Sequence, residues 1–225
     1  PALIFEQERE AGDQILNIEN LSYSIGDSVL FSNINLNLAK GDKLIVYSKD
    51  SRAVTAFYEI VNGKFVPEQG KVEWGVTTNN AYLPLDHDSY FENNFSLVDW
   101  LRQFAKTEEE REEVFIRGFL GKMLFSGEEA LKTCNVLSGG EKVRCMLSKM
   151  MMERANVLLF DEPTNHLDLE SITGLNNALN NYKGTLICST SDHAFSQSLG
   201  TRILELTPKG AIDRLTSFDD YMRDT

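Results

Sequence analysis

Two short segments of the sequence carry residue types suited to phosphate chemistry. The first reads LSGGE, spans residues 137–141 and stands at the start of a predicted helix. Ser138 can cap that helix, while Gly139 and Gly140 let backbone amides approach a phosphate at its positive end. Alone, this segment could be an ordinary helix cap, so its meaning depends on the residues downstream of it.

The second segment, VLLFDEPTNHLD, spans residues 157–168. The run VLLF predicts a buried strand that places Asp161 at its carboxyl end, where ligands bind in open α/β sheets. Asp161 could hold Mg²⁺ directly or through water, and Glu162 could orient or deprotonate a water molecule. In this order and spacing, the two segments together predict a nucleotide site.

The rest of the chain alternates between strand and helix patterns that would position these segments. The predicted strands lie at residues 15–21, 29–38, 42–48, 71–75, 80–84, 157–160, 185–190, 202–207 and 210–215. The predicted helices lie at residues 54–63, 97–105, 108–123, 141–155, 168–183 and 217–225. This alternation implies a mostly parallel sheet with helices on both faces. The acidic run TEEEREE is expected to be a solvated helix start, and the three methionines at 150–152 are expected in the core.

Composition excludes several other classes of protein. The 225 residues are 42% hydrophobic and 25% charged, which fits one large domain or one domain with an inserted subdomain. The net charge of −12 argues against strong nucleic-acid binding by this chain alone. Three cysteines without CxxC spacing make a zinc site or disulfide framework unexpected, and no apolar run approaches the length of a membrane span. Because the chain begins at Pro1 without a signal-peptide pattern, we interpret it as a fragment or processed piece in a reducing, cytoplasmic compartment.

With these motifs in place, the sequence resembles the ATP-binding cassette (ABC) ATPases. LSGGE matches their signature motif, VLLFD the Walker B strand, Glu162 the catalytic glutamate, and residues 165–168 the D-loop that ends at Asp168. The stretch DEPTNHLD followed by LESITGLNNALNNYKGTLI resembles the ABC-F branch, whose members carry two cassettes on one chain and include many that act on the ribosome. It looks closest to the C-terminal cassette of YbiT-type members, and the resemblance covers the whole chain.

The resemblance implies a fold and a domain organisation. The fold would be an α/β ABC nucleotide-binding domain with a mostly parallel RecA-like core sheet, an antiparallel β subdomain and an inserted helical subdomain at about residues 86–145. Residues 1–12 would be the end of an inter-cassette linker, and residues 13–225 the cassette itself. ATP and Mg²⁺ are the implied cofactors, and a second cassette on the same chain, arranged head to tail, is the implied partner.

The phosphate loop of the family, GxxxxGK[ST] or Walker A, is altered here. The aligned residues are Ser48-Lys49-Asp50-Ser51-Arg52-Ala53-Val54-Thr55, so both motif glycines and the lysine are replaced, and only Thr55 retains a hydroxyl for Mg²⁺. The missing lysine would have supplied a charge-assisted bond of about 1.5–3 kcal/mol, and its loss weakens binding by about 10- to 150-fold. Lys49 and Arg52 could compensate in part, although a cation on another loop does not rebuild the glycine cradle.

Other family positions that serve the cassette's own nucleotide are also altered. The Q-loop glutamine falls on Leu85, the switch histidine on Ser191, and the adenine-stacking aromatic near Ile25, with Tyr23 on the same strand face. By contrast, the signature motif and D-loop, which in the family serve the partner's ATP, are intact. We therefore predict a degenerate cassette that binds its own ATP weakly and completes a partner's site. There Ser138, Gly139 and Gly140 would touch the γ-phosphate and Glu141 would support the loop.

Two alternatives remain open from the sequence. The chain could be the ATP-binding subunit of a membrane transporter, or a non-hydrolysing module that has lost ATP chemistry altogether. The intact LSGGE argues against the second alternative if that motif has no structural purpose. Whether the chain is itself an enzyme stays open, and the isolated domain is expected to be inactive or very weak. The ribosome is a candidate partner, with any RNA contact resting on other segments or small local patches.

Overall fold

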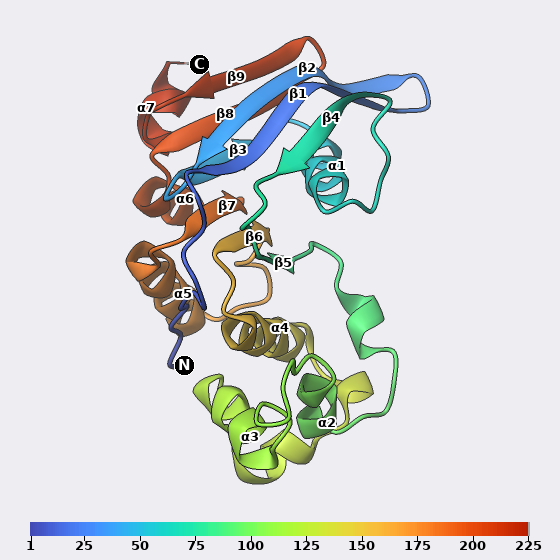
Figure 1. Cartoon of the computed structure of the whole chain (residues 1–225), viewed down its shortest axis with the longest axis vertical. Coiled ribbons are helices and arrows are strands. Elements are labelled where there is room, and N and C mark those ends of the chain that lie inside the picture. Colours follow the sequence, from blue (N-terminus) through green and yellow to red (C-terminus); the bar gives the residue numbers. More distant parts are fainter. Residues whose placement is uncertain (225) are drawn as a thin grey trace.

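The computed structural model describes residues 1–224 and has a six-stranded sheet at its centre (Figure 1). Its strands, in spatial order, are β5 (Asn80–Leu83), β6 (Val157–Asp161), β7 (Thr185–Ser189), β3 (Lys43–Tyr47), β8 (Arg202–Thr207) and β9 (Gly210–Arg214). All neighbours run parallel except the edge pair β8 and β9, which is antiparallel. The predicted mostly parallel core sheet is confirmed.

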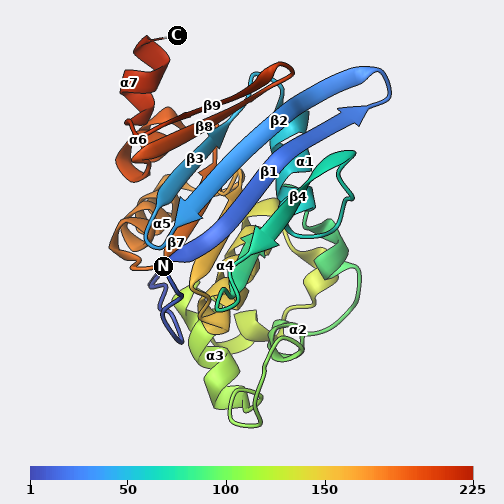
Figure 2. The same ribbon diagram turned by 45° about the horizontal axis from the view of Figure 1, so that its top comes forward.

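A second, antiparallel sheet covers one face of the first. Its strands, in spatial order, are β2 (Ser28–Ala39), β1 (Gln14–Ile25) and β4 (Gln69–Trp74). Figure 2 shows this sheet lying across the core sheet, with α1 (Ser51–Val61) packed beneath it. It is the antiparallel β subdomain that the sequence resemblance implies.

Alternating side chains of the central strands separate two hydrophobic cores. On β3, Leu44 and Val46 face the β subdomain and α1, whereas Ile45 faces the opposite layer of helices. On β6, Leu159 joins the first core and Phe160 the second. Because successive strand side chains point to opposite faces, a near-continuous apolar run is what a strand buried on both faces requires.

The helices on the other face are α4 (Gly139–Glu153), α5 (Leu169–Asn181), α6 (His193–Leu199) and α7 (Phe218–Arg223). The three methionines at 150–152 are buried on α4, as expected. Helix α6, which is only seven residues long, was not predicted from the sequence. The C-terminal helix was expected over 217–225 and is observed at 218–223, while residue 225 lies outside the described residues.

A helical subdomain is inserted between β5 and α4, at the end of the molecule far from the β subdomain (Figure 1). It consists of α2 (Leu97–Arg102), α3 (Glu113–Lys122) and the short 3₁₀ helices η1 (Asp88–Phe91), η2 (Gly127–Leu131) and η3 (Cys134–Val136). The prediction that a helix starts at residue 108 is wrong, because residues 108–112 form turns ahead of α3. That acidic run has no apolar side chain to bury against the core, and the Arg102 guanidinium contacts it through the Arg111 carbonyl at 2.8 Å.

The first twelve residues pack onto the cassette. The side chains of Leu3 and Phe5 are buried, and the Phe5 ring meets Phe160 of β6 edge to face with centroids 6.1 Å apart. The Ala2 amide donates to the Lys122 carbonyl at the end of α3, at 2.7 Å. The segment therefore spans from the helical subdomain to the core sheet. Its assignment as the end of a linker stays a prediction.

Candidate functional site

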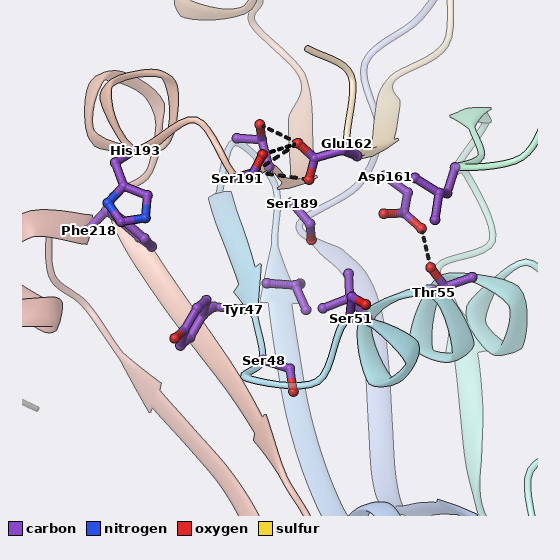
Figure 3. A pocket seen from close by; sticks show the side chains of 14 residues that line it. Tyr47, Ser48, Ser51, Thr55, Asp161, Glu162, Ser189, Ser191, His193 and Phe218 are labelled. Atoms are coloured by element: carbon purple, nitrogen blue, oxygen red, sulfur yellow. Dashed lines mark hydrogen bonds between the residues drawn. The ribbon is translucent and has the colours of Figure 1, made fainter. Parts of the chain in front are cut away.

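A cavity of about 280 Å³ opens at the carboxyl ends of β3, β6 and β7 (Figure 3). It is lined by Val46, Tyr47, Ser48, Ser51, Val54, Thr55, Leu85, Asp161, Glu162, Ser189, Thr190, Ser191, His193 and Phe218. Strand register explains the convergence, since Asp161 at the end of β6 pairs with Ser189 at the end of β7. The site therefore lies where parallel-sheet proteins bind ligands, as the sequence predicted for Asp161.

The loop from β3 to α1 ends in an acidic helix cap. Asp50 is the N-cap of α1, and its Oδ1 accepts a hydrogen bond from the Arg52 amide at 3.0 Å. The Arg52 guanidinium in turn lies 2.8 Å from Asp50 Oδ2. Hydrogen bonding from Arg52 lowers the pKa of the Asp50 carboxyl. A carboxylate thus already occupies the positive end of this helix.

The two cations proposed as substitutes for the missing lysine do not reach the cavity. Arg52 is paired with Asp50, and Lys49 borders a separate hollow against β8 together with Asp50 and Glu205. Among the described residues, no lysine or arginine lines the cavity at the sheet edge. The lining instead holds two carboxylates, Asp161 and Glu162, and a set of hydroxyls.

Thr55 and Asp161 are brought together as the sequence predicted. The Thr55 hydroxyl, on the first turns of α1, donates to Asp161 Oδ2 at 2.9 Å (Figure 3). Asp161 is 4% exposed, and burial raises its pKa to about 6. These are oxygen donors of the kind that Mg²⁺ prefers, so the pair fits the predicted metal role. The polyphosphate of ATP fits less well, because the cavity offers no positive side chain to hold it.

Glu162 lies beside Asp161 but is turned toward the loop after β7. Its backbone has a φ of +58°, an uncommon conformation for a residue other than glycine. Its Oε1 accepts hydrogen bonds from the Ser191 amide at 2.8 Å, the Ser191 hydroxyl at 2.8 Å and the Thr190 hydroxyl at 3.1 Å. The Ser191 amide also lies 2.9 Å from Oε2. The carboxylate predicted to activate water therefore already accepts hydrogen bonds from the loop after β7, most of them at Oε1.

The signature segment begins α4 with a reciprocal cap. The Ser138 hydroxyl accepts from the Glu141 amide at 3.2 Å, and the Glu141 carboxylate accepts from the Ser138 amide at 3.0 Å. Lys132 lies 2.8 Å from the same carboxylate, and its hydrogen bond lowers the pKa of Glu141. Glu141 thus supports the start of the signature helix, in the supporting position that the resemblance gave it.

The two signature glycines lie against the D-loop. A Cβ added to Gly140 would stand 2.6 Å from the His166 carbonyl oxygen, and one added to Gly139 would stand 3.0 Å from the His166 ring. The premise that LSGGE has no structural purpose is therefore wrong for the two glycines. The small size of Gly140 is required by packing against a backbone carbonyl, and a Cβ at Gly139 would be in tight contact with the His166 ring.

The remaining predicted residues lie outside the cavity or at its rim. Asp168 caps α5, accepting from the Ser171 amide at 2.7 Å, and this hydrogen bond lowers its pKa. Ile25 is 47% exposed at the end of β1, while Tyr23 stacks between Phe31 and Phe65. Tyr23 is thus already packed against other rings of the protein.

Several residues of the site were not anticipated from the sequence. Thr190 bridges to Glu162, Ser189 bonds Tyr58 at 3.0 Å, and Tyr47 and Phe218 form an aromatic wall together with His193. A usable signal existed for Thr190, because it follows a buried strand whose neighbour ends in Asp161. Polar residues after two adjacent parallel strands meet at one edge of the sheet.

Comparisons with known proteins agree with this geometry. The ABC transporter family model matches residues 31–165. The ABC transporter ATP-binding protein YkpA of Bacillus subtilis is 47% identical over 223 residues, covering 99% of this chain and 41% of its own length. The probable ATP-binding protein YbiT of Escherichia coli O157:H7 is 40% identical, covering 99% of this chain and 42% of its own. The chain thus spans about two fifths of the length of these relatives.

Solved structures show the same fold at low sequence identity. A dimeric ATP-binding cassette bound to ADP and Pi in a post-hydrolysis state has a TM-score of 0.72 and 16% identity, covering 89% of this chain and 98% of its own. A bacterial Atm1-family ABC exporter with ATP bound has a TM-score of 0.78 and 13% identity, covering 99% of this chain and 43% of its own. Among the helices within residues 1–224, none is long and apolar enough to cross a membrane. The family match and the site geometry together establish that this chain belongs to the ABC transporter family and is an ATP-binding cassette domain.

Proposed function

We propose that this cassette binds little or no ATP in its own cavity and instead completes the ATP site of a partner cassette. The observation that carries the proposal is the acidic cap of α1, where Asp50 occupies the helix end that a phosphate would otherwise approach. The helix dipole and the free amides at that end favour one anion. An ATP phosphate would have to displace Asp50 or lie beside it.

The charges around the cavity support the same conclusion. Asp161 and Glu162 line the cavity, and no cation does so among the described residues. Loss of the family lysine at Val54 alone weakens binding by about 10- to 150-fold. The internal bonds of Thr55 to Asp161 and of Ser191 to Glu162 add a further cost, because a nucleotide would have to compete with them.

The surface that would serve a partner, at the start of α4, is accessible from outside the chain. Ser138 is exposed at the start of α4, a 15-residue helix whose first turn carries the signature glycines. In the partner's site, Ser138, Gly139 and Gly140 would hold the γ-phosphate of the ATP bound there, and Glu141 would keep the loop in place. The assembly of a related cassette as a dimer supports this arrangement.

We further assign the chain to the ABC-F branch, as a C-terminal cassette of a cytoplasmic two-cassette protein. The energy-dependent translational throttle protein EttA of Escherichia coli K12 is 27% identical over 218 residues. With a net charge of −12, this cassette would leave most contact with ribosomal RNA to other segments of such a protein.

Two measurements test the proposal. Calorimetric titration of this chain with Mg-ATP should give no binding heat up to millimolar concentration, and micromolar binding would refute the degenerate-site assignment. In the full-length protein, Ser138→Arg should abolish ATP hydrolysis, whereas Ser28→Arg, at the exposed start of β2, should not. Unchanged hydrolysis in Ser138→Arg would refute the partner-site role.

The second candidate function is that of the ATP-binding subunit of a membrane transporter. The description of the matching family favours it, and the ABC exporter described above shares this fold. The two functions differ in the partner. Co-purification of the full-length protein with an integral membrane protein would support the transporter role, and co-sedimentation with ribosomes would support the ABC-F role.

A further inference from the structure

The loop after β7, residues 190–192, is held to the end of β6 by side-chain hydrogen bonds as well as by the sheet. Ser191 donates both its amide and its hydroxyl to the Glu162 carboxylate, and Thr190 donates its hydroxyl to the same group. The Glu162 amide also donates to the Ser189 carbonyl at 2.6 Å. Hydrogen bonds to a charged acceptor are among the stronger ones in proteins. We call this group of bonds the latch.

The latch continues into the D-loop through Thr190. Because the Thr190 hydroxyl donates to Glu162, it accepts from its other neighbours, the Asp192 amide at 3.1 Å and the Thr164 hydroxyl at 2.8 Å. Thr164 is buried and lies on the turn that begins the D-loop. Its carbonyl accepts from the Leu167 amide at 3.3 Å. One hydroxyl thus joins the loop after β7 to the D-loop turn.

The D-loop in turn rests on the signature motif. His166 has a φ of +65°, its carbonyl approaches Gly140 so closely that no Cβ would fit there, and its ring would stand in tight contact with a Cβ at Gly139. A displacement of the D-loop would therefore also shift the start of α4, because the two segments are in close contact. The path runs from Ser191 through Glu162 and Thr190 to Thr164, whose carbonyl closes the turn with the Leu167 amide. His166 lies within that turn and packs against the signature glycines.

We propose that Thr190 and Ser191 are positioning residues that fix the D-loop, and through it the signature motif, without any nucleotide in this cassette's own cavity. The inference rests on the proposed function, in which that motif serves the partner's ATP. The Glu162 carboxylate acts here as the acceptor that holds two loops together. This differs from the water-activating role predicted for it from the sequence.

The geometry favours this role because the polar groups involved are paired inside the chain. Thr55 is bonded to Asp161 and Ser189 to Tyr58, so the neighbouring side chains also have partners without a ligand. Pre-organised groups do not have to be ordered at the moment of reaction. A cassette that must present its signature motif while its own cavity is empty of nucleotide requires such internal pairing.

The test compares the double variant Thr190→Ala/Ser191→Ala with the conservative variant Thr190→Ser and with Ser196→Ala in the full-length protein. Ser196 is a matched control, because its buried hydroxyl on α6 has no hydrogen-bond partner within the described structure. Hydrogen exchange is measured without nucleotide on peptides covering residues 163–168 and 137–142. The double variant should raise exchange in both peptides by about tenfold or more. Thr190→Ser and Ser196→Ala should leave it unchanged.

ATP hydrolysis provides the second readout. The double variant should lower the kcat of the full-length protein with little change in KM, because the partner cassette's own nucleotide-binding residues are unchanged. Unchanged hydrogen exchange in the double variant would refute the positioning role of Thr190 and Ser191, whatever effect Ser138→Arg has on hydrolysis. If exchange rises in the double variant but Ser138→Arg leaves hydrolysis intact, the latch exists and the proposed function fails instead.

Discussion

Replacing Asp161 by asparagine should stabilise the protein at neutral pH. Asp161 is buried at the end of β6, and its carboxylate accepts a hydrogen bond from the Thr55 hydroxyl. The adjacent Glu162 adds a second negative charge, and burial is the main reason that the pKa of Asp161 rises to about 6. Asparagine has nearly the same shape, and its carbonyl oxygen can still accept from Thr55, so the change removes mainly the buried charge.

The size of the effect follows from proton linkage. A carboxyl that titrates at about 6 in the folded state, against 3.8 in the unfolded chain, favours folding when it is protonated. This contribution is fully present below pH 3.8 and is lost as the pH rises through 6. At pH 7.5 the ionised group costs about 3 kcal/mol, and at pH 4.5 about 1 kcal/mol. Asp161→Asn should therefore raise the free energy of unfolding by up to about 3 kcal/mol at pH 7.5 and by clearly less at pH 4.5.

The assay is urea unfolding followed by tryptophan fluorescence at both pH values, since Trp100 is fully buried and reports on the core. Asp27→Asn, at an exposed turn, is the matched control and should change stability by less than about 0.5 kcal/mol. A loss of stability in Asp161→Asn at pH 7.5 would refute the reasoning. It would mean that the carboxylate is compensated by a bound cation or by a rearrangement of the site. Addition of Mg²⁺ to the wild-type chain would then distinguish those two cases.

Two further predictions concern packing. Gly140→Ala should destabilise the chain by about 1–3 kcal/mol, because its Cβ would stand 2.6 Å from the His166 carbonyl oxygen. Gly121→Ala, on α3 with no atom near the new Cβ, should instead be neutral or stabilising by up to about 1 kcal/mol, and equal effects in urea unfolding would contradict the packing argument. Phe5→Ala should cost about 3 kcal/mol through loss of its buried contact with Phe160, whereas Ile4→Ala, at a position 58% exposed, should cost little. If the two variants unfold at the same urea concentration, the N-terminal segment is not held as described.

The sequence predicted the core of the fold well because its strands are buried on both faces. VLLF and TLIC are short apolar runs with no helical period, and both became central strands. Gly63 was expected near the end of a helix, and it follows the C-cap of α1 with a φ of +79°. Such local signals depend on neighbours in the chain, so they can be read without the tertiary structure.

The prediction of helices failed where burial of side chains, rather than helix propensity, decides whether a helix forms. Residues 108–112 are good helix formers, yet they form turns because no apolar side chain anchors them. Conversely, α6 is short and polar at several positions, but Phe195 and Leu199 are buried and hold it against the core. Neither outcome is visible in a short sequence window, since both depend on what lies opposite in the fold.

In the candidate site, too, some features could be predicted from the sequence and others could not. Motif positions located Thr55, Asp161 and Glu162 at one sheet edge, and the structure brings them there. The pairing of Glu162 with Ser191 was not predictable from either residue, because it depends on how the loop after β7 folds over β6. No role as a helix cap was predicted for Asp50, yet aspartate is a preferred N-cap, and that local rule could have predicted its position on α1.

The pairings around the cavity have a consequence for any ligand. A nucleotide entering this cavity would have to break or bypass the bonds that Asp161 and Glu162 make with Thr55 and Ser191. A phosphate at the start of α1 would also have to compete with the Asp50 cap. Each such bond, remade with water or a ligand, changes the free energy by about 1 kcal/mol or more, so ligand binding is opposed even before charge repulsion is considered. The same bonds order the loops in the absence of ligand. Weak nucleotide binding in this cavity and a fixed signature motif are therefore two results of one set of contacts, and a variant that loosens the contacts should affect both.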